Sequence, residues 1–284
     1  MSKLKEQLAA GTFAVTAEIA PPKGIDTAEA LAKAEAMRDL AAVNITDNQG
    51  ANMRMAPLAL AAMLQQKGIE PVLQLTCRDR NRLALQADLL GASALGIENL
   101  LIVSGDHARF GDHPHARAVF DLDSVQLLQT VATLSDGIDM AGKKLEGATR
   151  FFTGAAVSPE SAPFELMFQK FTKKIEAGAG FFQTQAVFDP DHLQMFMSEA
   201  AAYKKPVLAG ILLLKSARMA HFLNENIPGV QVPQTVVQRL EKAERPMEEG
   251  VAIARELVAQ ARSCCQGVHL MTLGCEERIP EILQ

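Results

Sequence analysis

The sequence predicts an α/β protein with the (β/α)8 architecture of a TIM barrel, in a single domain that spans residues 1–284. Three observations support this prediction. Eight short apolar segments of strand length alternate with segments of helical periodicity along the chain. These segments are apolar on both faces, as the buried strands of a parallel sheet are. No linker, low-complexity segment or repeat longer than one strand–helix unit divides the chain.

Each strand is expected where Val, Ile, Leu and Phe gather in a short run bounded by Gly, Pro or polar residues. The expected strands are 13–19, 43–46, 71–76, 99–103, 151–157, 181–185, 207–213 and 268–273. The expected helices are 27–40, 57–67, 80–95, 124–134, 164–177, 191–203, 217–224, 233–243 and 247–263. Asp26 can cap the first helix and Gly68 can end the second. A doubly wound open sheet is the alternative architecture, but no Gly-x-Gly-x-x-Gly turn follows the first strand.

The composition fits a globular protein and argues against several other classes. Hydrophobic residues make up 48% and charged residues 21% of the chain, so a large core can form. The formal net charge of -5 argues against a broad nucleic-acid surface. No apolar run approaches the roughly 18 residues of a membrane span, and the N-terminus lacks the features of a signal peptide. Four cysteines do not make a disulfide framework, so we expect a cytoplasmic protein.

The C-terminal ends of the strands are where a barrel of this kind places its chemistry. Glu18 lies near the end of the first expected strand, in an otherwise apolar run. Apolar surroundings disfavour the charged form of a carboxyl group, which suits a general acid near neutral pH. The alternative interpretation is a glutamate at a frayed strand end, paired with a surface lysine.

Two further strand ends carry candidate site residues. Asp106 follows Ser104 and Gly105 at the end of the strand 99–103, where the glycine allows close approach of a ligand. An ordinary Gly-Asp turn is the alternative there. Lys215 follows the strand 207–213 and has the position of a Schiff-base lysine, but the polar residues after it favour a phosphate or carboxylate contact or a helix cap.

A metal site is not predicted. Three histidines, His107, His113 and His115, share a loop with acidic residues, but zinc sites usually add cysteine or a more regular histidine pair. The cysteines near the C-terminus lack Cys-x-x-Cys spacing, so structural thiols are expected.

A series of short motifs resembles the methylenetetrahydrofolate reductase family, in family order and over almost the whole chain. Each motif is weak alone, but the ordered series is specific, and it is similar to short bacterial members without a regulatory domain. The motifs are Ala17-Glu18-Ile19-Ala20-Pro21-Pro22, Val43-Asn44-Ile45-Thr46, Leu75-Thr76-Cys77-Arg78-Asp79-Arg80-Asn81, Ser104-Gly105-Asp106-His107, Val119-Phe120-Asp121-Leu122-Asp123-Ser124, Glu176-Ala177-Gly178-Ala179, Phe182-Gln183-Thr184-Gln185 and Val207-Leu208-Ala209-Gly210-Ile211-Leu212.

The resemblance implies a flavoprotein that reduces 5,10-methylenetetrahydrofolate to 5-methyltetrahydrofolate, with hydride from the reduced flavin. It implies that Glu18 is the general acid that helps to open the imidazolidine ring, and that Asp106 lies near the flavin pyrimidine edge and the folate pterin. Gln185 matches a folate-contacting glutamine, and Lys215 is expected on the substrate side. The positions expected to contact the flavin are Thr46, Gln74, Ser104, Gly105, Asp106, Phe120 and Lys174.

Departures from the family leave the size of the cofactor open. Ser104 stands where well-known bacterial members carry arginine, and Gln74 stands where many members have histidine. FAD is expected, with FMN as the alternative. Lys170 and Lys174 are four residues apart on the expected helix 164–177, with Lys173 beside them, so they can reach one phosphate group together.

The resemblance also implies the partners: NADH or NADPH as a transient electron donor, or a partner redox subunit, in a homo- or hetero-oligomer. Three other functions are weighed against the reductase. They are an aldolase-type lyase barrel that uses Lys215, a pterin-binding methyltransferase barrel, and a non-catalytic folate-binding barrel that acts only with a partner redox protein. Glu18 together with Gly105-Asp106 favours the reductase.

Overall fold

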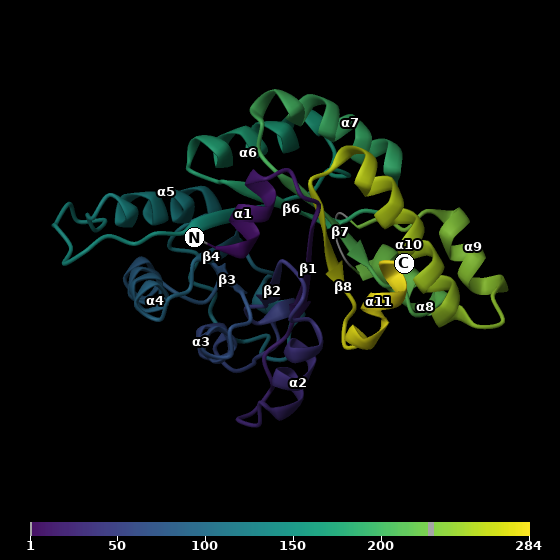
Figure 1. Ribbon diagram of the computed structural model, residues 1–284, viewed down its shortest axis with the longest axis horizontal. Helices are drawn as coiled ribbons and strands as arrows, with labels where there is room; N and C mark the ends of the chain where they lie inside the picture. The colour runs from purple at the N-terminus through teal and green to yellow at the C-terminus, as the bar shows by residue number, and fades with distance from the viewer. Residues whose placement is uncertain (1, 227–229) are drawn as a thin grey trace.

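A computed structural model describes residues 2–226 and 230–284, and its centre is a closed barrel of parallel strands in the order β1 to β8 (Figure 1). The barrel closes because β1 pairs with β8, from Ala14 opposite Gly267 to Ala17 opposite Leu270. This confirms the predicted TIM barrel and excludes the open sheet. The strands are β1 Ala14–Ile19, β2 Ala42–Ile45, β3 Pro71–Thr76, β4 Asn99–Val103, β5 Phe152–Val157, β6 Phe181–Ala186, β7 Val207–Leu212 and β8 Gly267–Met271.

The helices surround the strands on the outside of the barrel, except for α1, which lies across its N-terminal end (Figure 1). They are α1 Lys3–Ala9, α2 Ala28–Ala36, α3 Pro57–Gln66, α4 Arg82–Ala94, α5 Ser124–Ser135, α6 Phe164–Glu176, α7 Pro190–Ala200, α8 Ala217–Asn226, α9 Gln234–Lys242, α10 Pro246–Cys264 and α11 Ile279–Ile282, with 3₁₀ turns η1 Gln49–Ala51, η2 Ala108–Phe110, η3 Ala201–Tyr203 and η4 Glu276–Arg278. Their apolar faces pack against the strands to form the main core.

Most observed bounds lie within one residue of the expected ones, and larger differences occur at a few element ends. Helix α2 ends at Ala36 rather than at residue 40, because the N–H groups of Met37 and Arg38 bond to carbonyls three residues back. Strand β8 ends two residues early at Met271, and Leu273 takes a left-handed φ of 50°. The 3₁₀ turn η3 forms the last part of the helix expected over 191–203.

The N-terminal end of the barrel is closed by helix α1. The Ser2 hydroxyl caps this helix by accepting the N–H of Lys5 at 3.1 Å. Leu4 and Leu8 are buried and pack in one cluster with residues at the strand starts, such as Val72 and Phe181. Burial of each leucine stabilises the fold by about 1.5–3 kcal/mol. This end is therefore apolar and filled, which leaves the C-terminal end for ligands.

The loop after β4 lies against the loops after β1 and β2 at the C-terminal end. Asp112 accepts the N–H of Met53 at 3.0 Å and forms an ion pair with Lys23. A side chain at Gly111 would collide with the carbonyl oxygen of Ala51, 1.8 Å from the Cβ position, so the two segments are in close contact. These contacts fix one side of the barrel mouth.

Candidate functional site

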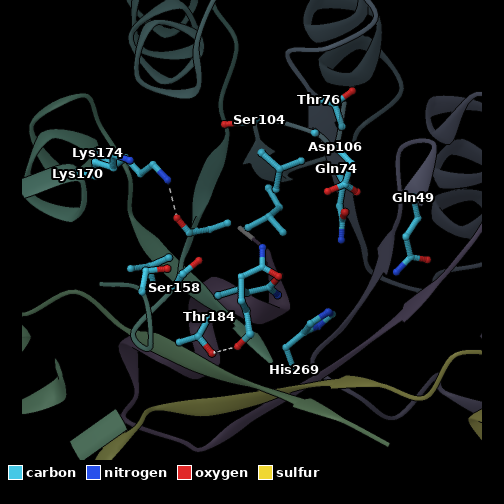
Figure 2. A pocket seen from close by; sticks show the side chains of 18 of the residues that line it. Gln49, Gln74, Thr76, Ser104, Asp106, Ser158, Lys170, Lys174, Thr184 and His269 are labelled. Carbon is cyan, nitrogen blue, oxygen red and sulfur yellow. Dashed lines mark hydrogen bonds between the residues drawn. The ribbon is translucent and has the colours of Figure 1, made fainter. Parts of the chain in front are cut away.

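A cavity of about 480 Å³ opens at the C-terminal ends of the strands (Figure 2). This volume falls within the usual range for small-molecule sites, which is roughly 300–1,000 Å³. Seven of the residues expected in a site line it: Glu18, Gln74, Ser104, Gly105, Asp106, Lys174 and Gln185. These residues come from five different strands or from the loops and helices that follow those strands. Sequence order alone therefore does not reveal the cavity.

Glu18 lies on β1, and both of its carboxylate oxygens have a partner. The residue is 8% exposed. Gln49 donates from Nε2 to Oε1 at 2.8 Å, and Nε2 of His269 lies 3.4 Å from Oε2. The other ring nitrogen of His269, Nδ1, lies 3.0 Å from the Thr16 hydroxyl. Glu18 is thus a buried carboxyl group inside the barrel mouth rather than a frayed strand end.

The loop that carries Asp106 is packed tightly onto β3. Gly105 has a φ of 86°, and a Cβ atom there would lie 3.0 Å from the Cβ of Thr76. The turn therefore requires glycine for both its conformation and its packing. Asp106 is exposed at the mouth, and no described residue donates a hydrogen bond to its carboxylate. The carboxylate is available to a ligand.

Arg78 is buried at the cavity wall and connects the loop that carries Asp106 to the loop after β2. Its guanidinium donates two hydrogen bonds to the carboxylate of Asp79, at 2.8 and 2.7 Å. It also donates to the backbone oxygen of Asp106 at 3.0 Å and to that of Asn48 at 3.3 Å. The bidentate pair raises the pKa of Arg78 and lowers the pKa of Asp79, so both stay charged at neutral pH.

Two lysines of α6 form the opposite wall of the cavity from Gln49 (Figure 2). Nζ of Lys174 donates to the backbone oxygen of Ala156 at 2.6 Å. Burial lowers the pKa of Lys174, and the charge of Lys170 lowers it further. No carboxylate pairs with either lysine within the described ranges 2–226 and 230–284. This wall has capacity to bind an anion.

Three of the expected site residues lie outside this cavity. Thr46 directly follows β2 and is buried, and its hydroxyl has no hydrogen-bond partner among the described residues. Phe120 is 41% exposed at the end of the loop after β4, with a left-handed φ of 40°. Lys215 donates from Nζ to the backbone oxygen of Leu273 at 2.5 Å. Lys173, next to Lys174 on α6, is exposed and also does not line the cavity.

The histidines of the loop after β4 do not gather into a metal site. In the part of the chain that the structure describes, no group of three His, Cys, Asp or Glu side chains has the geometry to hold a metal ion. His113 pairs instead with Asp112 at 2.8 Å. Across the same residues, no helix is long and apolar enough to cross a membrane.

Several cavity residues were not singled out by the sequence analysis. His269 and Gln183 lie on strands of the barrel, each a polar residue in a mostly apolar run, and are buried within it. The reasoning that selected Glu18 would have selected them too. Gln49 and Arg78 have no such signal, because they lie in loops that only the folded barrel brings to the cavity.

A second cavity of about 380 Å³ lies on the other side of Glu18. It is lined by residues of the loop after β1, of α2 and of the segment after β8. Its charged residues include Lys33, which pairs with Glu276 at 3.1 Å and with Glu29 at 2.9 Å. Glu18 and Gln49 line both cavities and form the wall between them.

The fold and the site define a TIM barrel with a polar cavity at its C-terminal mouth. One wall of the cavity carries Glu18, and another carries Lys170 and Lys174. The family model described as methylenetetrahydrofolate reductase matches residues 3–284. The chain therefore belongs to the methylenetetrahydrofolate reductase family, as the ordered motifs indicated.

Curated relatives agree with this assignment. The chain is 24% identical to methylenetetrahydrofolate reductase 2 of Schizosaccharomyces pombe over 258 residues, which cover 79% of this chain and 37% of that protein. It is 26% identical to methylenetetrahydrofolate reductase (NADH) 1 of Arabidopsis thaliana over 249 residues, or 80% of this chain and 40% of that protein. The chain thus matches well under half the length of these relatives.

Solved structures share the fold. An uncharacterized protein from Clostridium thermocellum, described as binding two copies of 5-methyl-5,6,7,8-tetrahydrofolic acid, superposes with a TM-score of 0.67 and 16% identity, over 99% of this chain and 96% of that one. A 2,3-dimethylmalate lyase superposes with a TM-score of 0.54 and 11% identity, over 99% of this chain and 84% of that one. At these identities the likeness concerns the fold alone.

Proposed function

We propose that this protein reduces 5,10-methylenetetrahydrofolate to 5-methyltetrahydrofolate with a bound flavin. The observation that carries the proposal is Glu18, a carboxyl group that is 8% exposed and held on both oxygens at the wall of the large cavity. A buried acid facing a ligand cavity is the arrangement that general acid catalysis requires. Membership of the family and a structural neighbour described as binding methyltetrahydrofolate support the same reaction.

The residues present fit a flavin. Lys170 and Lys174 offer cationic donors without a carboxylate partner, which suits the phosphates of FAD or FMN. Leu101, Val103 and Met271 line the same cavity and offer apolar surface for a flat ring. When bound, the flavin supplies the hydride. The electron donor in this proposal is NADH or NADPH, or else a partner redox protein.

The chain's own residues supply the proton and the position. Glu18 donates a proton to the leaving nitrogen of the imidazolidine ring, which opens the ring and leaves a cationic iminium at the other nitrogen. Asp106, exposed at the mouth, faces this developing positive charge and stabilises it. Gln185 and Gln74 line the cavity and provide amide groups for polar ring edges.

The test begins with the purified protein as it is expressed. Denaturation should release FAD or FMN, identified by chromatography against standards. The reduced protein is then mixed anaerobically with 5,10-methylenetetrahydrofolate, and reoxidation of the flavin should match the 5-methyltetrahydrofolate formed, one for one. A protein that neither retains nor takes up flavin, or a reduced protein that methylenetetrahydrofolate does not reoxidise, would refute the proposal.

A further inference from the structure

Gln49 is held in place by a tight turn after β2. Asn48, Gly50 and Ala51 have φ values of 47°, 63° and 59°, so the chain reverses within a few residues. The Asn52 side chain donates to the backbone oxygens of Gln49 and Gly50, at 3.3 and 3.2 Å. The Gln49 side chain is thereby directed toward the cavity, where Figure 2 shows it on the side opposite Lys174.

The partners of Glu18 determine which oxygen carries its proton. The Nε2 group of Gln49 can only donate, and a carbonyl oxygen accepts a hydrogen bond better than a hydroxyl oxygen does. The contact at 2.8 Å therefore favours Oε1 as the unprotonated oxygen. A histidine ring nitrogen can donate or accept, depending on its tautomer. Oε2 lies 3.4 Å from Nε2 of His269. This oxygen can therefore carry the proton when Glu18 is protonated, and can accept a hydrogen bond from the histidine when Glu18 is a carboxylate.

Gln49 and Glu18 both lie between the two cavities. Of the described residues, these two alone line both cavities, so their hydrogen bond lies within the wall that separates them. If this bond were absent, the Glu18 side chain would have the second cavity of about 380 Å³ beside it and could turn away from the substrate cavity. A misplacement of about 1 Å of a catalytic group can cost a hundredfold in rate.

We propose that Gln49 is a positioning residue for Glu18: it binds Oε1, favours Oε2 as the site of the acidic proton and keeps the carboxyl group at the substrate cavity. This inference rests on the proposed reduction for its kinetic consequence. The hydrogen bond itself is independent of that reaction, which allows the two to be tested separately.

The kinetic test uses Gln49→Met, which has a similar length and no donor, in the flavin-loaded protein. Reduction of the flavin by the donor should stay within about twofold, because Gln49 acts on the acid alone. Reoxidation by methylenetetrahydrofolate should slow by about tenfold or more at saturating folate, with little change in the folate concentration that gives half the maximal rate. Gln66→Met, the same change at an exposed position at the end of α3, is the control and should match the wild type.

The spectroscopic test uses infrared difference spectra between acidic and alkaline buffer. The carbonyl band of the protonated Glu18 is identified by its loss in Glu18→Gln. In Gln49→Met this band should move to higher frequency, because Oε1 no longer accepts a hydrogen bond. A band that stays in place, or unchanged reoxidation, would overturn the inference. Weaker folate binding at an unchanged maximal rate would also overturn it, since Gln49 would then contact the substrate. A shifted band in a protein whose wild type does not reduce folate would refute the proposed function instead.

Discussion

The main cavity has one wall that carries Glu18 and another that carries Lys170 and Lys174, and the charged groups of the two walls differ in their hydrogen-bond partners. On the Glu18 wall, the carboxyl group is surrounded by side-chain partners: Gln49 bonds one oxygen and His269 lies beside the other. On the Lys174 wall, the ammonium group has a single neutral partner, the backbone oxygen of Ala156. Burial lowers the pKa of Lys174, so the folded chain carries an electrostatic cost there.

This difference indicates which wall is complete without a ligand. A carboxyl group with both oxygens occupied is held in one orientation, as a proton donor must be. A half-buried lysine with one carbonyl partner retains unused donors, and an anion that reached it would recover the lost solvation. In the proposed function the first wall supplies chemistry and the second binds the cofactor, so substitutions in the two walls should affect different measurements.

The largest effect is expected at Glu18. Glu18→Gln keeps the shape of the side chain but removes the acidic proton, so reduction of methylenetetrahydrofolate should fall by at least about a hundredfold. Flavin content and flavin reduction by the donor should not change, because the proposal places the cofactor phosphates at the other wall and assigns Glu18 only the proton. Stopped-flow measurement of the two half-reactions checks this. Folate reduction at the wild-type rate in this variant would remove Glu18 from the mechanism.

The next effect is expected at Lys174. If Lys174 binds the flavin phosphates as proposed, Lys174→Ala should lower the affinity for flavin by about tenfold, while the flavin that stays bound reacts normally. Lys173→Ala is the matched control, because Lys173 is exposed on the same helix and does not line the cavity. Dialysis followed by measurement of flavin per chain distinguishes them. Full occupancy in Lys174→Ala would place the phosphates elsewhere.

Substitution of Asp106, at the mouth of the cavity, tests whether this position affects both the flavin and the binding of folate. Its carboxylate has no hydrogen-bond donor among the described residues, so Asp106→Asn should cost little stability. The proposal places Asp106 near the flavin, where a negative charge disfavours the anionic reduced form, so loss of the charge should raise the flavin reduction potential. Folate binding should weaken by about threefold to tenfold. A redox titration and a folate titration check the two effects; an unchanged or lower potential would show that Asp106 does not face the flavin.

The fold was predictable from the sequence because buried parallel strands leave a local signal. All eight strands lie where apolar runs were found, with end points that differ by at most two residues. Glu18 was found as a carboxylate within such a run. Gly105 was found by its place between the end of a strand and Asp106, and its φ of 86° favours glycine. These features depend on neighbours in the sequence.

The partners of the site were less predictable, because they depend on which loops meet in space. Nothing near Gln49 in the sequence indicates that it reaches Glu18, 31 residues away. Arg78 joins three loops through backbone oxygens, which any residue type provides. The four-residue spacing placed Lys170 and Lys174 on one face of the helix, but only the packing of α6 on the barrel shows that this face lines the cavity.

The smallest expected effect concerns the stability of the flavin-free protein, and it tests the electrostatic cost at Lys174 directly. Burial lowers the pKa of Lys174 below the ordinary value of 10.5 in the folded state. Between that lowered value and 10.5, the unfolded chain binds more protons than the folded chain, so stability rises with pH in that window. Below the window both states are charged and the full cost remains.

Lys174→Met removes this cost and should increase the free energy of unfolding near neutral pH, although in the proposed function it weakens flavin binding. The gain over the wild type should shrink as the pH approaches 10.5, where the wild-type lysine loses its charge in both states. Urea unfolding at neutral and alkaline pH measures the difference, with Lys173→Met as the exposed control. A variant that is less stable than the wild type, or a gain that does not depend on pH, would show that Lys174 is as well satisfied as Glu18 and that the two walls are alike.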